Sequence, residues 1–262
     1  MTLYEKEGEQ TLRAPIHNGS FQLEGIVGRP TVARIAVGND APFYLWVENA
    51  EMALVYNSAL PSASHITGSR VNSEYRYVLE QCADAGGTLS DAVVAYASNN
   101  PEKGFVPFML WLHYDGNEPT KLDSLCQRFS GDAAKAYHLP LLKKRVLAMR
   151  QSAEGQPIPS ITLPTLKGKA EPYDSLYRHD RSTYLLFAST WMEKERHCND
   201  SLLARVDTTT AQVVWVPTDK DPAGWDAPYM QQLDIHRLPY IILISPKGTI
   251  EKRDLRIWEI GR

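Results

Sequence analysis

The sequence predicts an α/β domain at the C-terminal end of the chain, preceded by a small antiparallel β domain and a helical segment. Three observations lead to this fold class. Short strand-like segments separated by turn residues make the chain β-rich up to about residue 68, and apolar residues then recur with the helical period up to about residue 153. A glycine and two prolines interrupt the pattern between residues 154 and 159. After this break, strand-like and helix-like segments follow in the order β-α-β-α-β-β.

The composition is that of an ordinary globular protein. The 262 residues are 43% hydrophobic and 23% charged, with a formal net charge of −3. These values give no reason to expect a nucleic-acid or anionic-membrane partner. The one basic run, Lys143-Lys144-Arg145, falls in a helical pattern and is expected to form a solvated helix face. No stretch reaches the ~18 apolar residues of a membrane span, and no signal peptide is recognised.

Residues 1–68 are predicted to form the β-rich module. A turn at Asn18-Gly19, followed by alternation over residues 21–24, predicts a strand after the turn. Further strands are expected at residues 31–37, 43–47 and 52–56. We expect Tyr44 and Trp46 to be exposed aromatics that take part in sheet packing, because aromatic residues favour strands, and not to form a ligand surface.

Residues 69–153 are predicted to form the helical segment. Apolar residues recur at positions i, i+3, i+4 and i+7 over residues 75–82, and the pattern repeats over residues 89–97. A strongly apolar segment at residues 105–114 and two further stretches, residues 122–129 and 134–149, complete the five. Cys82 and Cys126 lie on apolar faces, where a free cysteine behaves as a small hydrophobic residue. With Cys198 they make an odd and scattered set, which indicates neither a disulfide framework nor a metal site.

Residues 154–262 are predicted to form the α/β domain. A hairpin is expected around residues 161–169, with a helix beginning near Glu193 and another over residues 225–233. The remaining strands are expected at residues 184–187, 213–216, 240–244 and 249–255.

Short motifs recur in a fixed order through this domain. They are Gly155-x-Pro157-x-Pro159, Leu163, Gly168, Leu186-Phe187-Ala188-Ser189-x-Trp191, Arg196, Leu202, residues 214–216 with Asp219, Leu238-Pro239, and Ile244-x-Pro246-x-Gly248-x-Ile250. In this order and spacing they resemble thioredoxin-like proteins of the TlpA/ResA type. Those proteins belong to the alkyl hydroperoxide reductase and thiol-specific antioxidant superfamily.

Motifs in the first module are also familiar. Gly19-x-Phe21-x-Leu23-x-Gly25, Val47-Glu48-Asn49-Ala50 and Thr67-Gly68-Ser69 resemble a β-rich domain of unknown function that precedes a thioredoxin-like domain in envelope proteins of Gram-negative bacteria. The resemblance implies a location in the periplasm or cell envelope. It also implies that the chain starts inside the β-rich module, which is then incomplete.

The resemblance implies where the site lies and which groups it lacks. Members of the family carry Trp-Cys-x-x-Cys at the start of the first long helix, whereas here Met192 and Glu195 stand in the two cysteine positions. Neither side chain can attack or resolve a disulfide, so no catalytic residue is expected. A cleft is expected around Trp191, Leu238 and Pro239, and the family position of Leu238-Pro239 predicts a cis peptide bond.

Other polar and titratable groups lie near this site. Cys198 lies six residues beyond Met192, outside the first turn where the helix dipole would activate a thiol, so it is expected to pack and not to react. Glu193 and His197 have the spacing of metal ligands, but zinc requires about four, and a solvated acidic helix start containing Glu195 is the preferred interpretation. No metal and no cofactor are expected. His236 and Arg237 are expected to lie in a solvated loop close to the cleft.

The sequence therefore predicts a redox-inactive thioredoxin-like protein of the envelope, acting as a binding or accessory module for an unknown protein partner. The alternative is a thiol:disulfide oxidoreductase, or a monothiol redox enzyme that uses Cys198. The missing cysteine pair favours the first function, and the activity usual in the family favours the second.

Overall fold

The computed structural model describes residues 1–5, 8–38, 40, 43–60, 64–176 and 178–260. The chain folds as two compact units, Met1–Lys144 and Arg145–Arg262. The division into residues 1–68, 69–153 and 154–262 stays a prediction, and its last two residues lie outside the described part. None of the described helices combines the length and the apolar character needed to cross a membrane.

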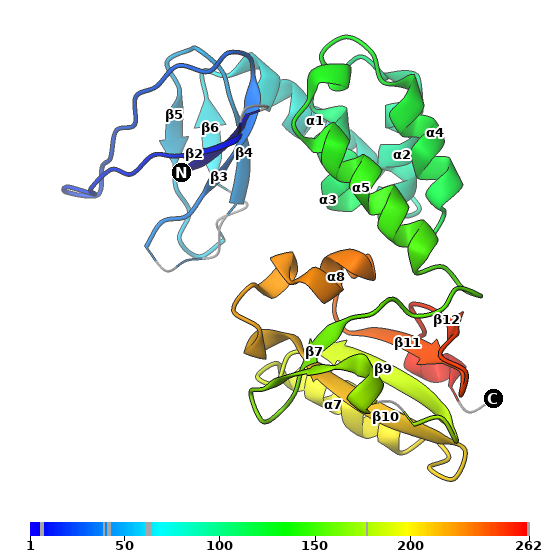
Figure 1. The fold of residues 1–262 in the computed structure, drawn as a ribbon. Helices are drawn as coiled ribbons and strands as arrows, with labels where there is room; N and C mark the ends of the chain where they lie inside the picture. Colours follow the sequence, from blue (N-terminus) through cyan, green and yellow to red (C-terminus); the bar gives the residue numbers. More distant parts are fainter. Residues whose placement is uncertain (6–7, 39, 41–42, 61–63, 177, 261–262) are drawn as a thin grey trace. The chain divides into compact units, whose positions relative to one another are not determined.

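The first unit begins with an antiparallel sheet in the order β2-β1-β3-β4 (Figure 1). Its strands are β1 (Thr2–Glu5), β2 (Gly8–Thr11), β3 (Thr31–Ile35) and β4 (Phe43–Val47), and a separate hairpin joins β5 (Ala53–Val55) to β6 (His65–Thr67). Six buried apolar side chains form the core of this β-rich part, namely Val27, Ala33, Ile35, Phe43, Leu45 and Ile66. Strands β3, β4 and β5 confirm the predicted positions, whereas β1, β2 and β6 were not predicted because they are short and largely polar.

The prediction for residues 17–24 is half right. The turn is present, with Asn18 and Gly19 at φ 50° and 75° and a bridge between His17 and Ser20. These positive φ angles suit asparagine and glycine, which explains the turn. Residues 21–24 form no strand, because alternation alone supplies no neighbouring strand with which to exchange backbone hydrogen bonds.

All five predicted helices form, as α1 (Arg70–Asp84), α2 (Leu89–Asn99), α3 (Val106–His113), α4 (Pro119–Arg128) and α5 (His138–Gln151). Side chains of Ser69 and Thr88 cap α1 and α2 by accepting from backbone N–H groups at 3.0 and 3.1 Å. Helix α5 starts four residues later than predicted, after a 3-10 turn at Ala133–Lys135. Pro140 explains the shift. Proline fits in the first turn of a helix, but in the interior it lacks the backbone N–H and its ring clashes with the carbonyl four residues earlier, so the helix cannot begin a full turn before it.

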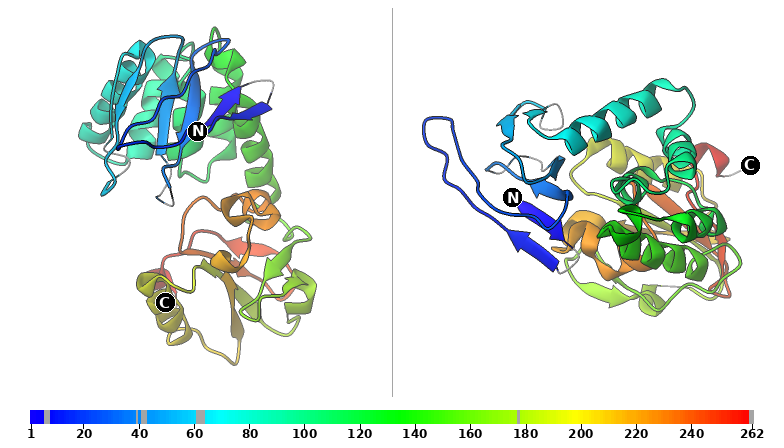
Figure 2. Two further views of the ribbon diagram at one scale, coloured as in Figure 1. Left: turned by 90° about the vertical axis from the view of Figure 1, so that its left-hand side faces the viewer. Right: turned by 90° about the horizontal axis from the view of Figure 1, so that it is seen from above.

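Trp46 joins the first sheet to the helices of the same unit. Its ring is 4% exposed and lies 6.0 to 6.3 Å from the rings of Tyr75, Phe105 and Phe108. Its backbone N–H donates to Asn72 on α1 at 3.2 Å. In both views of Figure 2 the blue sheet and the helix α1 lie side by side. Packing is therefore confirmed as a role of Trp46, but the expected exposure is wrong.

The second unit contains a four-stranded sheet in the order β10-β9-β11-β12. Strands β9 (Ser182–Ala188) and β10 (Ala211–Pro217) are parallel, β11 (Tyr240–Ile244) runs antiparallel to β9, and β12 (Ile250–Lys252) runs antiparallel to β11. The hairpin of β7 (Thr162–Pro164) and β8 (Ala170–Pro172) and the short α6 (Tyr173–Leu176) precede this sheet. The order β-α-β-α-β-β is confirmed, and this topology is the thioredoxin-like fold that the resemblance implies.

Helices cover both faces of this sheet, α7 (Glu193–Leu203) on one side and α8 (Pro228–Gln232) on the other (Figure 1). The alternation of β9 sends Leu186 toward Leu202 of α7 and sends Phe187 toward Tyr229 of α8. The apolar run of β9 is thus explained by burial on both faces. Helix α8 is shorter than predicted because Pro228 starts it, leaving Gly224–Asp226 as a separate 3-10 turn.

Candidate functional site

The loop between β9 and α7 carries the residues that replace the redox pair. Strand β9 ends at Ala188, and Met192 is the N-cap residue of α7, with φ −78° and ψ 119°. The side chain of Met192 makes no capping hydrogen bond and is 38% exposed, and Trp191 beside it is 71% exposed. The first degenerate position therefore lies at the open N-terminus of a helix, where a thiolate would be stabilised but where a thioether gains nothing.

Glu195, at the second degenerate position, is buried. It is only 4% exposed, and its carboxylate accepts a hydrogen bond from the backbone N–H of Ser189. The expectation of a solvated acidic helix start is therefore wrong for this residue. The physical reason is that the N–H of Ser189 follows the end of β9 inside the protein and needs an acceptor, which the first turn of α7 supplies.

A second carboxylate holds the next residue of the loop. Asp219, just after β10, accepts from the backbone N–H of Thr190 at 2.6 Å and from its hydroxyl at 2.7 Å. Burial raises the pKa of Asp219, but the two hydrogen bonds from Thr190 outweigh it, so the pKa lies below its ordinary value. Asp219 was recognised as a motif residue, but its hydrogen bonds were not foreseen, because Thr190 lies 29 residues earlier in the chain.

These contacts define what the loop can do. Glu195 and Asp219 occupy the backbone donors of Ser189 and Thr190, and the loop carries no thiol. Dithiol exchange requires a thiolate that attacks and a second thiol that resolves the mixed disulfide. A thioether and a buried hydrogen-bonded carboxylate can perform neither step, so Met192 and Glu195 do not supply the two groups that dithiol exchange uses.

Helix α7, which follows this loop, contains the cysteine Cys198. This cysteine is 5% exposed and packs in the cluster that contains Leu186 and Leu202. Burial raises the pKa of its thiol, and the carboxylate of Glu195 raises it further. Both effects disfavour the thiolate, which is the reactive form. The other two cysteines, Cys82 and Cys126, are also buried, as expected for packing residues.

The Leu238–Pro239 peptide bond is cis, as the resemblance predicted. In the sheet, Tyr240 is paired with Phe187, so Pro239 lies beside Ala188 at the edge from which the β9–α7 loop departs. The topology thus brings the segment of Leu238 and Pro239 to the same edge of the sheet as Trp191. A cleft formed by these residues stays a prediction.

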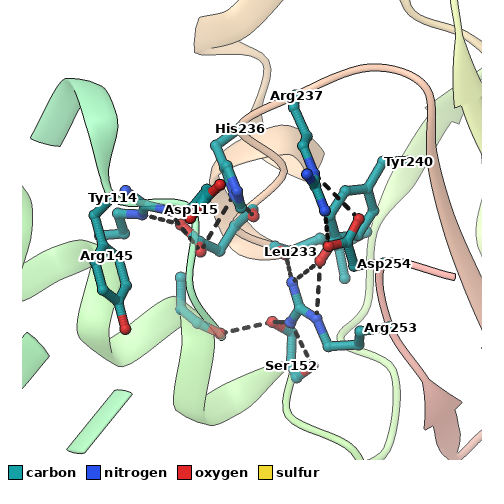
Figure 3. Close-up of polar contacts among 12 residues, drawn as sticks. Tyr114, Asp115, Arg145, Ser152, Leu233, His236, Arg237, Tyr240, Arg253 and Asp254 are labelled. Atoms are coloured by element: carbon teal, nitrogen blue, oxygen red, sulfur yellow. Dashed lines mark hydrogen bonds and ion pairs between the residues drawn. The ribbon is translucent and has the colours of Figure 1, made fainter. Parts of the chain in front are cut away.

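A buried polar cluster precedes this proline. Asp234, with φ 48°, is 6% exposed and pairs with Arg145 of α5, whose Nε lies 2.7 Å from its carboxylate. His236, whose side chain is labelled in Figure 3, lies 3.8 Å from the same carboxylate. Burial, and next the charge of Arg145, lower the pKa of His236. Arg237 pairs with Asp254.

Two expectations are corrected by this cluster. Arg145 does not belong to a solvated helix face, because its side chain is only 9% exposed. His236 and Arg237 are not simply solvated, because one is largely buried and the other forms an ion pair. Lys143 and Lys144 are exposed as expected. Sequence patterns miss such pairs because the partners are 89 residues apart.

Arg253 forms a second polar connection within the same unit (Figure 3). Its guanidinium donates to the backbone carbonyl and hydroxyl of Ser152, to the carbonyl of Leu233 and, at 3.1 Å, to the hydroxyl of Tyr240. It therefore ties the end of α5 to the loop after α8 and to β11. The sequence did not predict this role of Arg253, because the residue lies in the expected strand at residues 249–255 with no motif around it.

The acidic start of α7 contains Glu193 and His197, the two residues with metal-ligand spacing. Among the residues that the structure describes, no three His, Cys, Asp or Glu side chains gather closely enough to hold an ion. Glu193 and His197 are both exposed, whereas Glu195 turns inward.

Comparisons with known proteins give structural matches only. No protein-family model and no curated protein matches the chain. The thioredoxin domain of a thiol-disulfide oxidoreductase from Bacteroides vulgatus is similar at 20% identity and a TM-score of 0.33, over 40% of this chain and 89% of that one. A thiol-disulfide oxidoreductase from Bacteroides fragilis is similar at 21% identity and a TM-score of 0.32, over 38% and 91%.

A thioredoxin-like protein from Bacteroides caccae matches over more of the chain. The similarity covers 65% of this chain and 73% of that one, at 11% identity and a TM-score of 0.46. With TM-scores below 0.5, these matches are similarities only. The second unit is thioredoxin-like on its own strand order, its helices on both sheet faces and its cis-proline before β11.

Proposed function

We propose that this chain is a thioredoxin-like protein that does not exchange dithiols and that serves as a binding or accessory module of the cell envelope. The observation that carries the proposal is the burial of Glu195, whose carboxylate accepts the N–H of Ser189. Glu195, at the position of the resolving cysteine, takes part in the hydrogen bonding of the loop. Dithiol exchange at this loop would require a cysteine in place of both Met192 and Glu195.

The same edge of the sheet is suited to contact with a protein partner. Trp191 and Met192 present apolar surface to solvent beside the segment of Leu238 and Pro239. A loop whose backbone donors are already satisfied by carboxylates holds its shape, which lowers the entropy lost on binding. Tryptophan is also the residue type that most often dominates the binding energy of an interface.

The alternative, a monothiol enzyme that uses Cys198, is disfavoured by the burial and raised pKa of that thiol. Incubation of the native protein with oxidised glutathione, followed by mass spectrometry of the intact chain, separates the two functions. We expect no adduct on Cys198 until the protein is unfolded. Rapid formation of a mixed disulfide on native wild type, absent from Cys198→Ser, would support the monothiol enzyme instead.

The binding role needs its own experiment. The wild-type chain is used to capture proteins from an envelope extract, in parallel with Trp191→Ala and with Trp258→Ala as a matched exposed tryptophan. A partner retained by wild type and Trp258→Ala but lost with Trp191→Ala supports docking at this edge. Equal capture by all three variants contradicts it. The envelope location rests on the sequence resemblance and is tested by fractionating cells that express the full-length protein.

A further inference from the structure

Strand β10 forms one edge of the sheet in the second unit. Its hydrogen-bonded neighbour is β9, whereas β7 pairs with β8 and not with β10. The strand from Ala211 to Pro217 runs in continuous register with β9, without a bulge. The other side of β10 therefore has no neighbouring strand among the residues that the structure describes.

Alternate residues of β10 direct their backbone groups to this open side. The N–H of Ser182 on β9 donates to the carbonyl of Thr210 at 3.1 Å. In a parallel ladder the residues that face the neighbouring strand alternate, so residues 212, 214 and 216 face β9 as well. The backbone N–H and C=O groups of Val213 and Trp215 then point away from β9. No described residue forms a hydrogen bond with these backbone groups.

The interior of β10 lacks the features that usually protect an exposed edge. The strand reads Ala-Gln-Val-Val-Trp-Val-Pro, with no charged side chain, and its proline is the last residue. Exposed edges are commonly blocked by lysine, by an internal proline, by a bulge or by a very short length. Residues 212–215 are half-buried, so part of each reaches solvent. Such a regular, uncharged edge is suited to pairing with a further strand.

The hydrogen-bonding groups of β10 match those of a second copy. In an antiparallel pairing centred on Val214, Val213 of one chain lies opposite Trp215 of the other. Residues directly opposite in this way exchange both of their backbone hydrogen bonds. The two symmetric pairs then use the N–H groups of both residues on both chains, and the register covers the whole strand.

The ends of the strand fit the same register. There Ala211 of one chain lies opposite Pro217 of the other. The N–H of Ala211 already donates to the carbonyl of Asp207 at 2.9 Å, and proline has no N–H. Neither residue therefore leaves a donor without an acceptor. The lack of charge also matters, because two-fold pairing brings the same short segment of both chains together and like charges would repel.

We propose that two copies of this chain associate through β10, antiparallel and centred on Val214, so that their two four-stranded sheets form one continuous sheet. Val213 and Trp215 both lie on the α7 face, and an aromatic side chain opposite a β-branched one is a favourable cross-strand pair. The second copy is favoured over an unrelated strand because it supplies the uncharged sequence and the matching ends. A single strand pair buries little surface, so we expect a Kd of about 100 µM.

The first measurement is the average mass of the full chain by light scattering, between about 10 µM and about 1 mM. We expect the mass to rise with concentration from that of one chain toward that of two. Val213→Pro removes an outward N–H from each chain and should weaken self-association at least about tenfold. Val213→Thr is the matched control, since it keeps the N–H and the β-branched shape, and it should stay within about threefold of wild type. A constant mass of one chain, or equal association of the two variants, overturns the proposal.

The second measurement uses the wild-type protein and does not depend on how a variant folds. Amide hydrogen exchange is measured at single residues in the dilute and in the concentrated sample. The N–H groups of Val213 and Trp215 should exchange at least about threefold more slowly in the concentrated sample, because pairing protects them. The N–H of Val214, which faces β9, should exchange equally in both. A mass that doubles without slower exchange at Val213 and Trp215 places the contact elsewhere and overturns the proposal.

Discussion

Replacing Arg253 with methionine should strongly destabilise the thioredoxin-like unit. The guanidinium donates to the carbonyl of Ser152, the carbonyl of Leu233 and the hydroxyl of Tyr240. All three acceptor residues are fully buried, at 0% exposure in each case. Methionine keeps much of the aliphatic stem but donates no hydrogen bond.

The expected magnitude follows from these contacts. A buried acceptor that loses its only donor costs ~1–3 kcal/mol, and bonds from a charged donor lie in the upper part of that range. The costs of the three unpaired acceptors do not simply add. The variant also avoids the free-energy cost of burying the charged guanidinium, which offsets part of the loss. We therefore expect Arg253→Met to lower the free energy of unfolding by ~3–5 kcal/mol.

Urea unfolding followed by tryptophan fluorescence measures this loss, with the transition of the second unit fitted separately. Lys252→Met is the matched control, since the side chain of Lys252 is 59% exposed and its ion pair with Glu154 lies at the surface. The control should change the free energy of unfolding by less than ~0.5 kcal/mol. A loss below ~1 kcal/mol for Arg253→Met would refute the assigned role of the arginine.

Three further outcomes are expected. Arg145→Met leaves the Asp234 carboxylate buried without its partner and should cost ~3–5 kcal/mol of stability, whereas Lys144→Met should be near neutral; equal effects in urea unfolding would contradict the ion pair. Burial lowers the pKa of His138 to about 3, so the protein should lose up to ~4 kcal/mol between pH 6.5 and pH 3, where the unfolded chain binds the proton and the folded one does not; His138→Gln should remove this part of the pH dependence of the urea midpoint, and an unchanged slope would contradict it. Limited proteolysis should release a C-terminal fragment that begins close to residues 155–159, and cleavage confined to residues 71–150 would argue against the three-part division.

The sequence was most informative where structure is local. The apolar run of β9, the break at Ser189 and the helix starting at Glu193 were all predicted, because strand burial and helix periodicity act over neighbouring residues. The cis bond before Pro239 was also predicted, although by resemblance and not by local physics. The strand predicted from the alternation at residues 21–24 is wrong, because alternation does not indicate whether a neighbouring strand is available for pairing.

Contacts between distant residues could not be predicted. Glu195 lies in a run of charged residues at a helix start, where carboxylates are usually solvated, and only the fold brings it under the N–H of Ser189. Arg145 sits in a basic run, yet its partner Asp234 is 89 residues away. The same limit applies to Arg253 and Ser152, which are 101 residues apart. Periodicity indicates which face of a helix or strand is buried, but it does not identify the polar group from a distant segment that contacts this face.

The most direct test of the account is the turnover of a protein disulfide by the purified chain. Reduction of insulin in the presence of dithiothreitol is compared for wild type, Cys198→Ser and Met192→Cys/Glu195→Cys. We expect wild type and Cys198→Ser to show no rate above the reductant alone, and the double variant to gain activity because it regains both thiols at the start of α7. Wild-type turnover comparable to an ordinary thioredoxin and abolished by Cys198→Ser would contradict the account.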